Sequence, residues 1–173
     1  VGLRPGEVVL DCGVGFGDQC ELWASEFEVR RVVAIELSAE HAEAARERLR
    51  ERRPAAADAG DIEIHTGSAT DLPSGAAAAA AGCDVVLCLD CAYHFDTRER
   101  FLRAAGGLLR HGGRLGTVDM LPCDVGWGWR RLAQYAVAAA CNIPRANLCT
   151  ASGYRDACRR AGLEVTSLET LNP

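Results

Sequence analysis

The 173-residue sequence contains no uninterrupted apolar run of about 18 residues, so it predicts no membrane-spanning helix. It also lacks a basic stretch followed by an apolar one at its beginning, so no secretory signal is indicated. Basic residues are not in excess either, because 19 lysines and arginines face 24 aspartates and glutamates, a net charge of −5. A phosphate backbone attracts a basic surface, so we expect no extended nucleic-acid interface and leave room only for a local basic patch.

Paired cysteine spacing is lacking too, although cysteines are numerous. The nine cysteines are an odd number and are scattered, unlike the framework of a small disulfide-rich secreted domain. Cys88, Cys91 and His94 are spaced like three metal ligands, but no second ligand pair follows at zinc-finger or ribbon spacing. We therefore predict no metal site and interpret the cysteines as reduced, small apolar side chains. This interpretation predicts a cytoplasmic or other reducing compartment.

The pattern of apolar residues alternates between strand and helix periods. Apolar runs predict five strands at residues 8–10, 31–36, 61–66, 85–89 and 114–119, and a last strand near 163–171. Helical spacing predicts helices at 17–27, 38–53, 97–109, 127–141 and 151–161. The alanine run 76–81 is either a connecting helix or a loop expansion. The sequence therefore predicts an α/β fold, a doubly wound and mostly parallel sheet with helices on both faces.

A glycine-rich turn follows the first strand. Asp11 precedes Gly13, Gly15 and Gly17, whose alternate spacing lets a backbone turn tightly and approach a ligand closely. Glu36 ends the second strand 19 residues after Gly17 and offers two acceptor oxygens to a ribose diol. Ligands of such sheets bind at the carboxyl ends of the strands, so these residues predict a nucleotide-type site. The alternative is a strand–helix turn that binds nothing.

Two details separate the candidate cofactors. The turn has the form G-x-G-x-G rather than G-x-G-x-x-G, and Asp11 stands directly before it. A carboxylate there would repel a pyrophosphate, whereas it would attract a cationic sulfonium or ammonium group. The chemistry favours S-adenosylmethionine, and an NAD(P)-dependent oxidoreductase is the weaker alternative.

Four ordered segments resemble motifs of the class I S-adenosylmethionine-dependent methyltransferases of the small-molecule type. They are residues 11–17, 36–38, 67–73 and 109–115. The resemblance covers about residues 6–120 and implies a Rossmann-like fold. It also implies a single S-adenosylmethionine-binding domain over residues 1–173, with a core at 6–120 and substrate-side helices and a sixth strand at 121–173. The family's lid helices and last antiparallel strand are not found, so we expect a core trimmed at both ends.

The resemblance implies a role for each matching residue of the cofactor site. Asp11 would help to hold the methionyl group, and Glu36 would bind the ribose hydroxyls. Leu37 would lie against the adenine ring. Ser68 takes the place of the family's aspartate near the adenine amino group, and Ala69 follows it in the same motif.

The segment after the fourth strand lies where this family presents groups to the methyl acceptor. Similar O-methyltransferases carry a histidine there, so His94 is a candidate general base, since an imidazole titrates near neutrality. Asp90 is a candidate for the catalytic and cofactor sites, and Tyr93, His94 and Trp127 are candidates for substrate contacts. The structural alternatives are packing for His94 and Tyr93, a cap for Asp90, and cover of apolar surface for Trp127.

The sequence also limits the choice of acceptor. It has no Asn/Asp-Pro-Pro-Tyr/Phe segment, which argues against methylation of an exocyclic base nitrogen or a glutamine amide. We expect methyl transfer to a small molecule, with oxygen favoured over nitrogen or carbon. A catalytically silent cofactor-binding scaffold is the main alternative, and the oligomeric state is not predicted.

Overall fold

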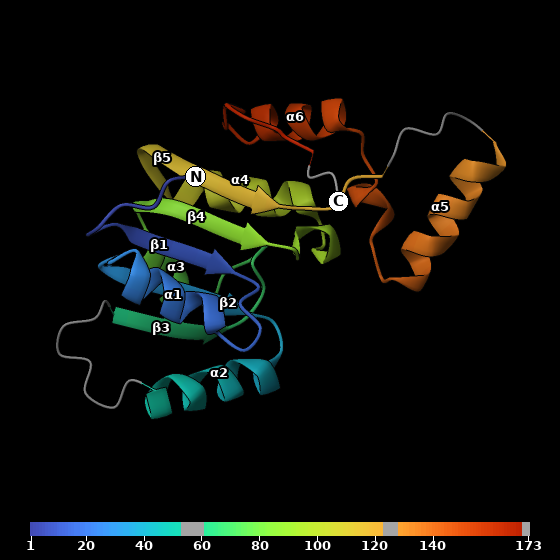
Figure 1. Cartoon of the computed structure of the whole chain (residues 1–173). Coiled ribbons are helices and arrows are strands. Elements are labelled where there is room, and N and C mark those ends of the chain that lie inside the picture. The colour runs from blue at the N-terminus through green and yellow to red at the C-terminus, as the bar shows by residue number, and fades with distance from the viewer. Residues whose placement is uncertain (53–60, 123–127, 171–173) are drawn as a thin grey trace.

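The computed structural model describes residues 1–52, 61–122 and 128–170 (Figure 1). The strands are β1 (Val8–Cys12), β2 (Arg31–Glu36), β3 (Asp61–Thr66), β4 (Cys83–Leu89) and β5 (Leu109–Val118). The helices are α1 (Asp18–Glu26), α2 (Ala39–Arg52), α3 (Ser74–Ala80), α4 (Arg98–Leu108), α5 (Trp129–Ala140) and α6 (Ala151–Arg160). Short 3₁₀ turns lie at Ala92–His94 and Arg145–Asn147.

The five strands form one sheet in the order β3-β2-β1-β4-β5, and every neighbouring pair is parallel. This arrangement confirms the predicted doubly wound α/β fold. The chain leaves β1 toward β2 on one side and returns to β4 on the other, so the direction of winding changes between β1 and β4. The carboxyl ends of all five strands point to the same edge, where Figure 1 shows the arrowheads. Ligands of such sheets bind at this edge, beside the change of winding.

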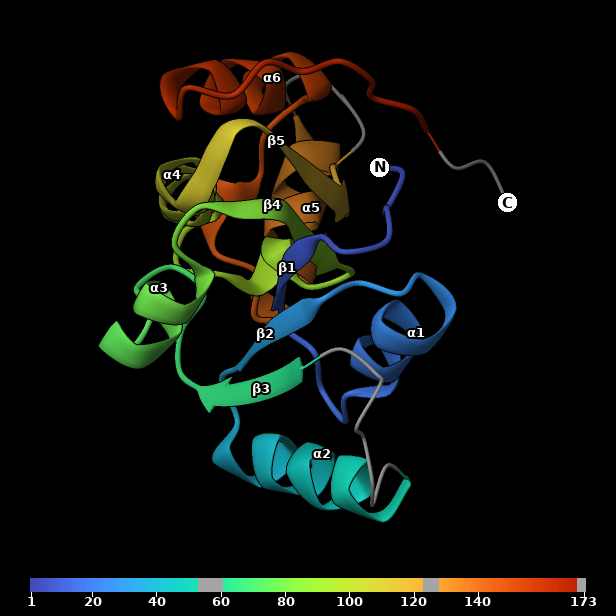
Figure 2. The ribbon, with the colours of Figure 1, turned by 90° about the vertical axis from the view of Figure 1, so that its left-hand side faces the viewer.

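Alternate side chains of the strands form two cores, one on each face of the sheet. Leu10, Val33 and Val86 belong to the core under α3, α4 and α6, whereas Val9 and Val32 belong to the core under α1. Figure 2 shows α1 and α3 on opposite sides of the sheet. The two-residue period of a strand explains why the central apolar runs carry no polar face.

The structure decides one alternative that the sequence left open and corrects the start of one strand. The alanine run lies in a helix, α3, whose Ala76 and Ala80 are fully buried. β5 begins at Leu109, five residues before the predicted start at Arg114. Cys83 pairs with Leu109 and Val85 pairs with Arg114, so residues 110–113, which lie between the predicted helix and the predicted strand, form a bulge in β5.

The predicted last strand is wrong for residues 163–170, and residue 171 lies outside the described part of the chain. Leu163, Val165 and Leu168 do pack against the core, so the apolar pattern marked burial correctly. These residues form no ladder with β5, the edge strand of the described sheet, so their burial comes from side-chain packing and not from strand pairing. Trp127 also lies outside the described residues. No helix of the described segments is long and apolar enough to cross a membrane.

Candidate functional site

Three loops meet at the carboxyl edge of the sheet. The Gly15 N–H after β1 donates to Glu36 Oε2 at the end of β2, at 2.8 Å. The Gly67 N–H after β3 donates to the Glu36 carbonyl at 2.9 Å, and the Cys91 thiol after β4 donates to the Cys12 carbonyl at 3.1 Å. The segments that carry Gly15, Glu36, Gly67 and Cys91 therefore form one continuous surface, as the parallel topology requires.

The three glycines of the first turn have different roles. All have positive φ, 78° at Gly13, 55° at Gly15 and 78° at Gly17, which disfavours any other residue. A Cβ at Gly13 would lie 2.5 Å from Cys91 Sγ, and one at Gly17 would lie 3.1 Å from Ala45 Cβ. No atom lies within 4 Å of the corresponding position at Gly15. Gly13 and Gly17 are thus needed for packing, while Gly15 faces open space where a ligand can approach.

Glu36 closes this turn against the start of α2. Its Oε2 accepts from Gly15, and its Oε1 accepts from the Ser38 N–H at 2.9 Å. The residue is only 9% exposed. A carboxylate has about four lone-pair sites, so the two amide bonds leave acceptor capacity for a diol.

An apolar rim surrounds Glu36. Leu37 is 74% exposed and Phe16 is 52% exposed, so both present apolar surface at this edge of the sheet. The Phe16 ring lies 4.8 Å from the His41 ring, and His41 Nδ1 lies 3.9 Å from Glu36 Oε1. The prediction included Leu37 but missed Phe16 and His41. The sequence does carry a signal for Phe16 that the prediction did not use, which is an aromatic residue between two glycines of a tight turn.

Asp11 lies behind the turn, fully buried on the α1 face of the sheet. Its Oδ2 accepts from Trp23 Nε1 at 2.8 Å, and its Oδ1 accepts from Gln19 Nε2 at 3.3 Å. Burial raises the pKa of Asp11 to about 7, although the Trp23 hydrogen bond acts in the opposite direction. Asp11 therefore links β1 to α1, and in this geometry it has no surface open to a ligand.

The segment after β3 carries Ser68, which is partly exposed, and Ala69, which is buried. Ser68 Oγ accepts from the Thr70 N–H at 3.2 Å and lies 2.8 Å from Thr70 Oγ1. Ala69 is buried in the core, so only its backbone is available at the edge. Ser68 is partly exposed and holds a local turn, which leaves its hydroxyl at the surface of the site.

The segment after β4 carries the candidate acceptor residues. Asp90 is exposed, has a φ of 57°, and donates its N–H to the Val118 carbonyl at 2.8 Å. His94 is also exposed, and its Nδ1 lies 3.5 Å from the Asn142 carbonyl oxygen. A carbonyl only accepts, so in the neutral imidazole that donates through Nδ1 to this carbonyl, Nε2 is the acceptor. The Tyr93 and His94 ring centroids are 4.4 Å apart, and Tyr93 is buried. Burial, and to a smaller extent the hydrogen bond with Asp90, raises the pKa of Tyr93.

A buried network that the sequence did not predict anchors this segment from behind. The Asn147 side chain accepts from the Arg98 N–H at 2.8 Å and donates to the carbonyls of Tyr93 and Phe95 at 2.9 and 2.7 Å. The Arg98 guanidinium forms a buried ion pair with Asp119 at 2.7 Å. Asn147 lies about 50 residues from its partners, and no local pattern signals such a contact.

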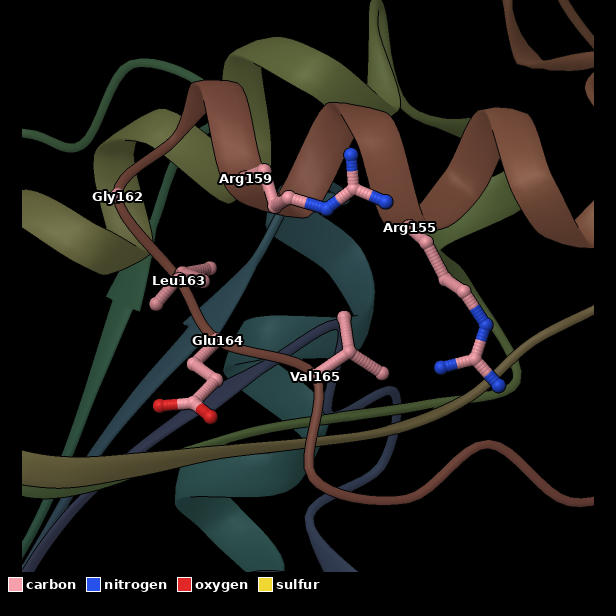
Figure 3. A pocket seen from close by; sticks show the side chains of 6 residues that line it. All are labelled: Arg155, Arg159, Gly162, Leu163, Glu164 and Val165. Carbon is pink, nitrogen blue, oxygen red and sulfur yellow. The ribbon is translucent and has the colours of Figure 1, made fainter.

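A metal site and a surface pocket are two alternatives to the residues at the carboxyl edge. Among the described residues, no three histidine, cysteine, aspartate or glutamate side chains are grouped to hold a metal ion. A surface pocket of about 470 Å³ lies between α6 and the segment after it, lined by Arg155, Arg159, Gly162, Leu163, Glu164 and Val165 (Figure 3). None of the described candidate residues lines this pocket, so the carboxyl edge remains the candidate site.

Residues 10–117 match the family model described as a methyltransferase domain. The match covers more than half of the chain, so the chain belongs to this family. Family and fold together identify a class I S-adenosylmethionine-dependent methyltransferase domain, as the sequence predicted.

One curated relative is erythromycin 3''-O-methyltransferase of Saccharopolyspora erythraea. It is 35% identical over 124 residues, which are 72% of this chain and 38% of the relative. The chain thus spans less than half the length of the relative it matches.

Solved structures show the same fold. A putative methyltransferase from Bacillus halodurans matches with a TM-score of 0.71 at 23% identity. The match covers 93% of this chain and 64% of the other chain. Phosphoethanolamine N-methyltransferase 2 of Haemonchus contortus, solved with S-adenosyl-L-methionine, has a TM-score of 0.72 at 18% identity. That match covers 93% of this chain and 34% of the other. The fold and family predictions are confirmed, whereas the roles of individual residues stay predictions.

Proposed function

We propose that this chain binds S-adenosylmethionine at the carboxyl edge of its sheet and transfers the methyl group to a hydroxyl group of a small molecule. The observation that carries the cofactor part is the turn at Gly15. There a positive-φ glycine faces open space and its N–H is tied to a carboxylate with spare acceptor capacity.

Each residue of the proposed cofactor site has its own role. Glu36 is placed to accept the ribose hydroxyls, and the Gly15 backbone allows the cofactor to approach without a clash. Leu37 and Phe16 offer exposed apolar surface to the adenine ring. We assign Asp11 a positioning role, since it holds α1 against the turn through Trp23 rather than facing the ligand.

In the proposed acceptor site, His94 supplies a general base and Asp90 supplies a negative charge. When bound, S-adenosylmethionine supplies a methyl carbon attached to a positively charged sulfur. His94 Nε2 is free to accept the hydroxyl proton as the oxygen attacks, because Nδ1 is directed to the Asn142 carbonyl. The exposed Asp90 carboxylate favours a cation nearby. Asn147 holds the Tyr93 and Phe95 backbone, and this fixes the approach of the acceptor, which methyl transfer in line requires.

The choice of oxygen and of a small molecule is supported by the relative whose printed activity is 3''-O-methylation of erythromycin. The net charge of −5 argues against a nucleic-acid acceptor. No Asn/Asp-Pro-Pro-Tyr/Phe segment is present to hold a planar nitrogen acceptor.

Thermal unfolding with S-adenosylhomocysteine, NAD or NADP tests the cofactor. A ligand at about 100 times its Kd adds roughly 2.7 kcal/mol, which shifts Tm by about 5–11 °C in a domain of this size. We expect a shift with S-adenosylhomocysteine alone, a smaller one in Glu36→Gln, and an unchanged one in the exposed control Glu40→Gln. A shift with NAD(P) alone would refute the proposal.

A panel of hydroxylated acceptors, including glycosylated natural products, then tests turnover through the release of S-adenosylhomocysteine. Methylated product bonded through oxygen supports the proposal. Cofactor binding without turnover on any acceptor would instead identify a catalytically silent scaffold.

A further inference from the structure

Two thiols lie side by side at the carboxyl end of β4. Cys88 Sγ and Cys91 Sγ are 3.1 Å apart. Cys88 is fully buried in the core, whereas Cys91, three residues later, is partly exposed at the edge of the sheet. The function proposed above uses neither thiol.

The pair is joined to the glycine turn of the cofactor site. A carbonyl only accepts, so the Cys91 thiol donates to the Cys12 carbonyl at 3.1 Å, and the Cys88 thiol donates to Cys91 Sγ. Cys91 Sγ also occupies the space that a Cβ on Gly13 would enter, 2.5 Å from that position. The position of Cys91 Sγ thus determines the packing against both Cys12 and Gly13.

We propose that Cys88 and Cys91 are a redox modification site, at which a peroxide forms a reversible disulfide that weakens cofactor binding. The disulfide itself requires only the two thiols and the oxidant. Its effect on the cofactor rests on the function proposed above.

The reaction balances without a further reactant. Cys91 is the accessible partner, and its sulfur attacks the peroxide O–O bond to give a sulfenic acid and one water molecule. Cys88 then attacks the Cys91 sulfur, the S–O bond breaks, and a second water molecule leaves with the Cys88 proton. Two thiols are oxidised by two electrons, and one hydrogen peroxide is reduced to two waters. A dithiol reductant reverses the change by exchange.

The burial of Cys88 determines which thiol reacts first. The hydrogen bond with Cys91 and burial raise the pKa of Cys88 well above its ordinary value. Cys91 therefore reacts with the peroxide first, and Cys88 gives up its proton only as it attacks the Cys91 sulfenic acid, when its hydrogen bond to the Cys91 thiol has been lost.

The disulfide would change the turn in two ways. A bond length of about 2.05 Å draws the two sulfurs together by about 1 Å from their present 3.1 Å. It also removes both S–H groups, so the Cys12 carbonyl loses its thiol donor. Both changes act on Cys12 and on Gly13, which is the first glycine of the turn proposed to contact the cofactor.

The first measurement treats the reduced, purified chain with hydrogen peroxide and then alkylates it in denaturant. We expect two of the nine thiols to become resistant to alkylation until dithiothreitol is added, with a disulfide-linked Cys88–Cys91 peptide in the digest. Cys88→Ala and Cys91→Ala should form no such linkage. Cys141→Ala, which removes an exposed thiol at the end of α5, should behave like the wild type. A linkage between other cysteines, or irreversible oxidation of Cys91 alone, would overturn the proposal.

The second measurement compares S-adenosylhomocysteine affinity by calorimetry in reduced, oxidised and re-reduced protein. We expect the affinity to fall about tenfold on oxidation, the scale of one net hydrogen bond, and to return with dithiothreitol. Either cysteine variant, once circular dichroism shows it folded, should lose this response. A disulfide that leaves affinity within about twofold would overturn the regulatory part. If reduced protein binds no S-adenosylhomocysteine, the proposed function fails while the thiol chemistry is still decided by the first measurement.

Discussion

Replacing Asp11 by asparagine should change how the stability of the protein depends on pH. Asp11 is fully buried, and its pKa in the folded chain rises from an ordinary 3.8 to about 7 because burial disfavours the charged carboxylate. The unfolded chain ionises Asp11 above its ordinary pKa, while the folded chain keeps it protonated up to about pH 7. Between these two values the folded state binds more protons, so the free energy of unfolding falls as pH rises.

The size of the effect follows from the two pKa values. Each pH unit between them costs about 1.4 kcal/mol, and most of the interval lies above pH 5. The wild type should therefore lose about 3 kcal/mol of unfolding free energy from this group between pH 5 and pH 8, and little more at higher pH. Asp11→Asn carries no titrating group and should lack this part of the dependence.

Urea unfolding of both proteins at pH 5, 6, 7 and 8 measures the difference directly. Asp71→Asn, at an exposed carboxylate, is the matched control and should follow the wild type. Trp23→Phe removes the indole N–H that lowers the Asp11 pKa and should move the end of the transition to higher pH. Parallel profiles for wild type and Asp11→Asn would refute the argument, because Asp11 would then not titrate in this window.

Three further predictions concern the site. Glu36→Gln should weaken S-adenosylhomocysteine by about 1–3 kcal/mol, the range for a charge-assisted hydrogen bond, and unchanged calorimetric affinity would exclude Glu36 from the cofactor site. His94→Ala should lower turnover by about 10²–10⁴-fold with little effect on cofactor affinity if the acceptor is a hydroxyl, and wild-type kcat would reduce His94 to packing. Asn147→Ala should cost about 1–3 kcal/mol of stability and raise KM for the acceptor more than for the cofactor, because Arg98 and the segment after β4 lose their anchor. Equal effects on both KM values would show a general loss of stability instead.

The sequence predicted the sheet well because each central strand is a short apolar run between turn residues. Val85–Leu89 and Arg31–Glu36 are examples, and the parallel topology then places Glu36 and Asp90 at one edge. Residues 163–170 show the limit, because apolar spacing indicates which side chains are buried but not whether the backbone pairs with the edge strand β5.

The candidate site was predictable in its location but less so in its contacts. Asp11 stands in the expected motif, yet its side chain is held by Trp23 from the next helix, and only the packed structure shows this. The contact of Asn147 with Arg98 joins residues far apart in the chain, which no local pattern records. Cys91 looked like a metal-spaced cysteine, while its close approach to Gly13 depends on how β4 lies beside β1.

The central place of β1 in the sheet has a consequence during synthesis. Among the described strands β1 is synthesised first, but its partner β4 follows about 75 residues later, since Val9 pairs with Val85. At about 5–20 residues per second, one edge of β1 waits for roughly 4–15 seconds without its neighbour. The nascent chain therefore carries an unprotected apolar strand edge over this interval, which is when it is most exposed to misassociation and most in need of a chaperone.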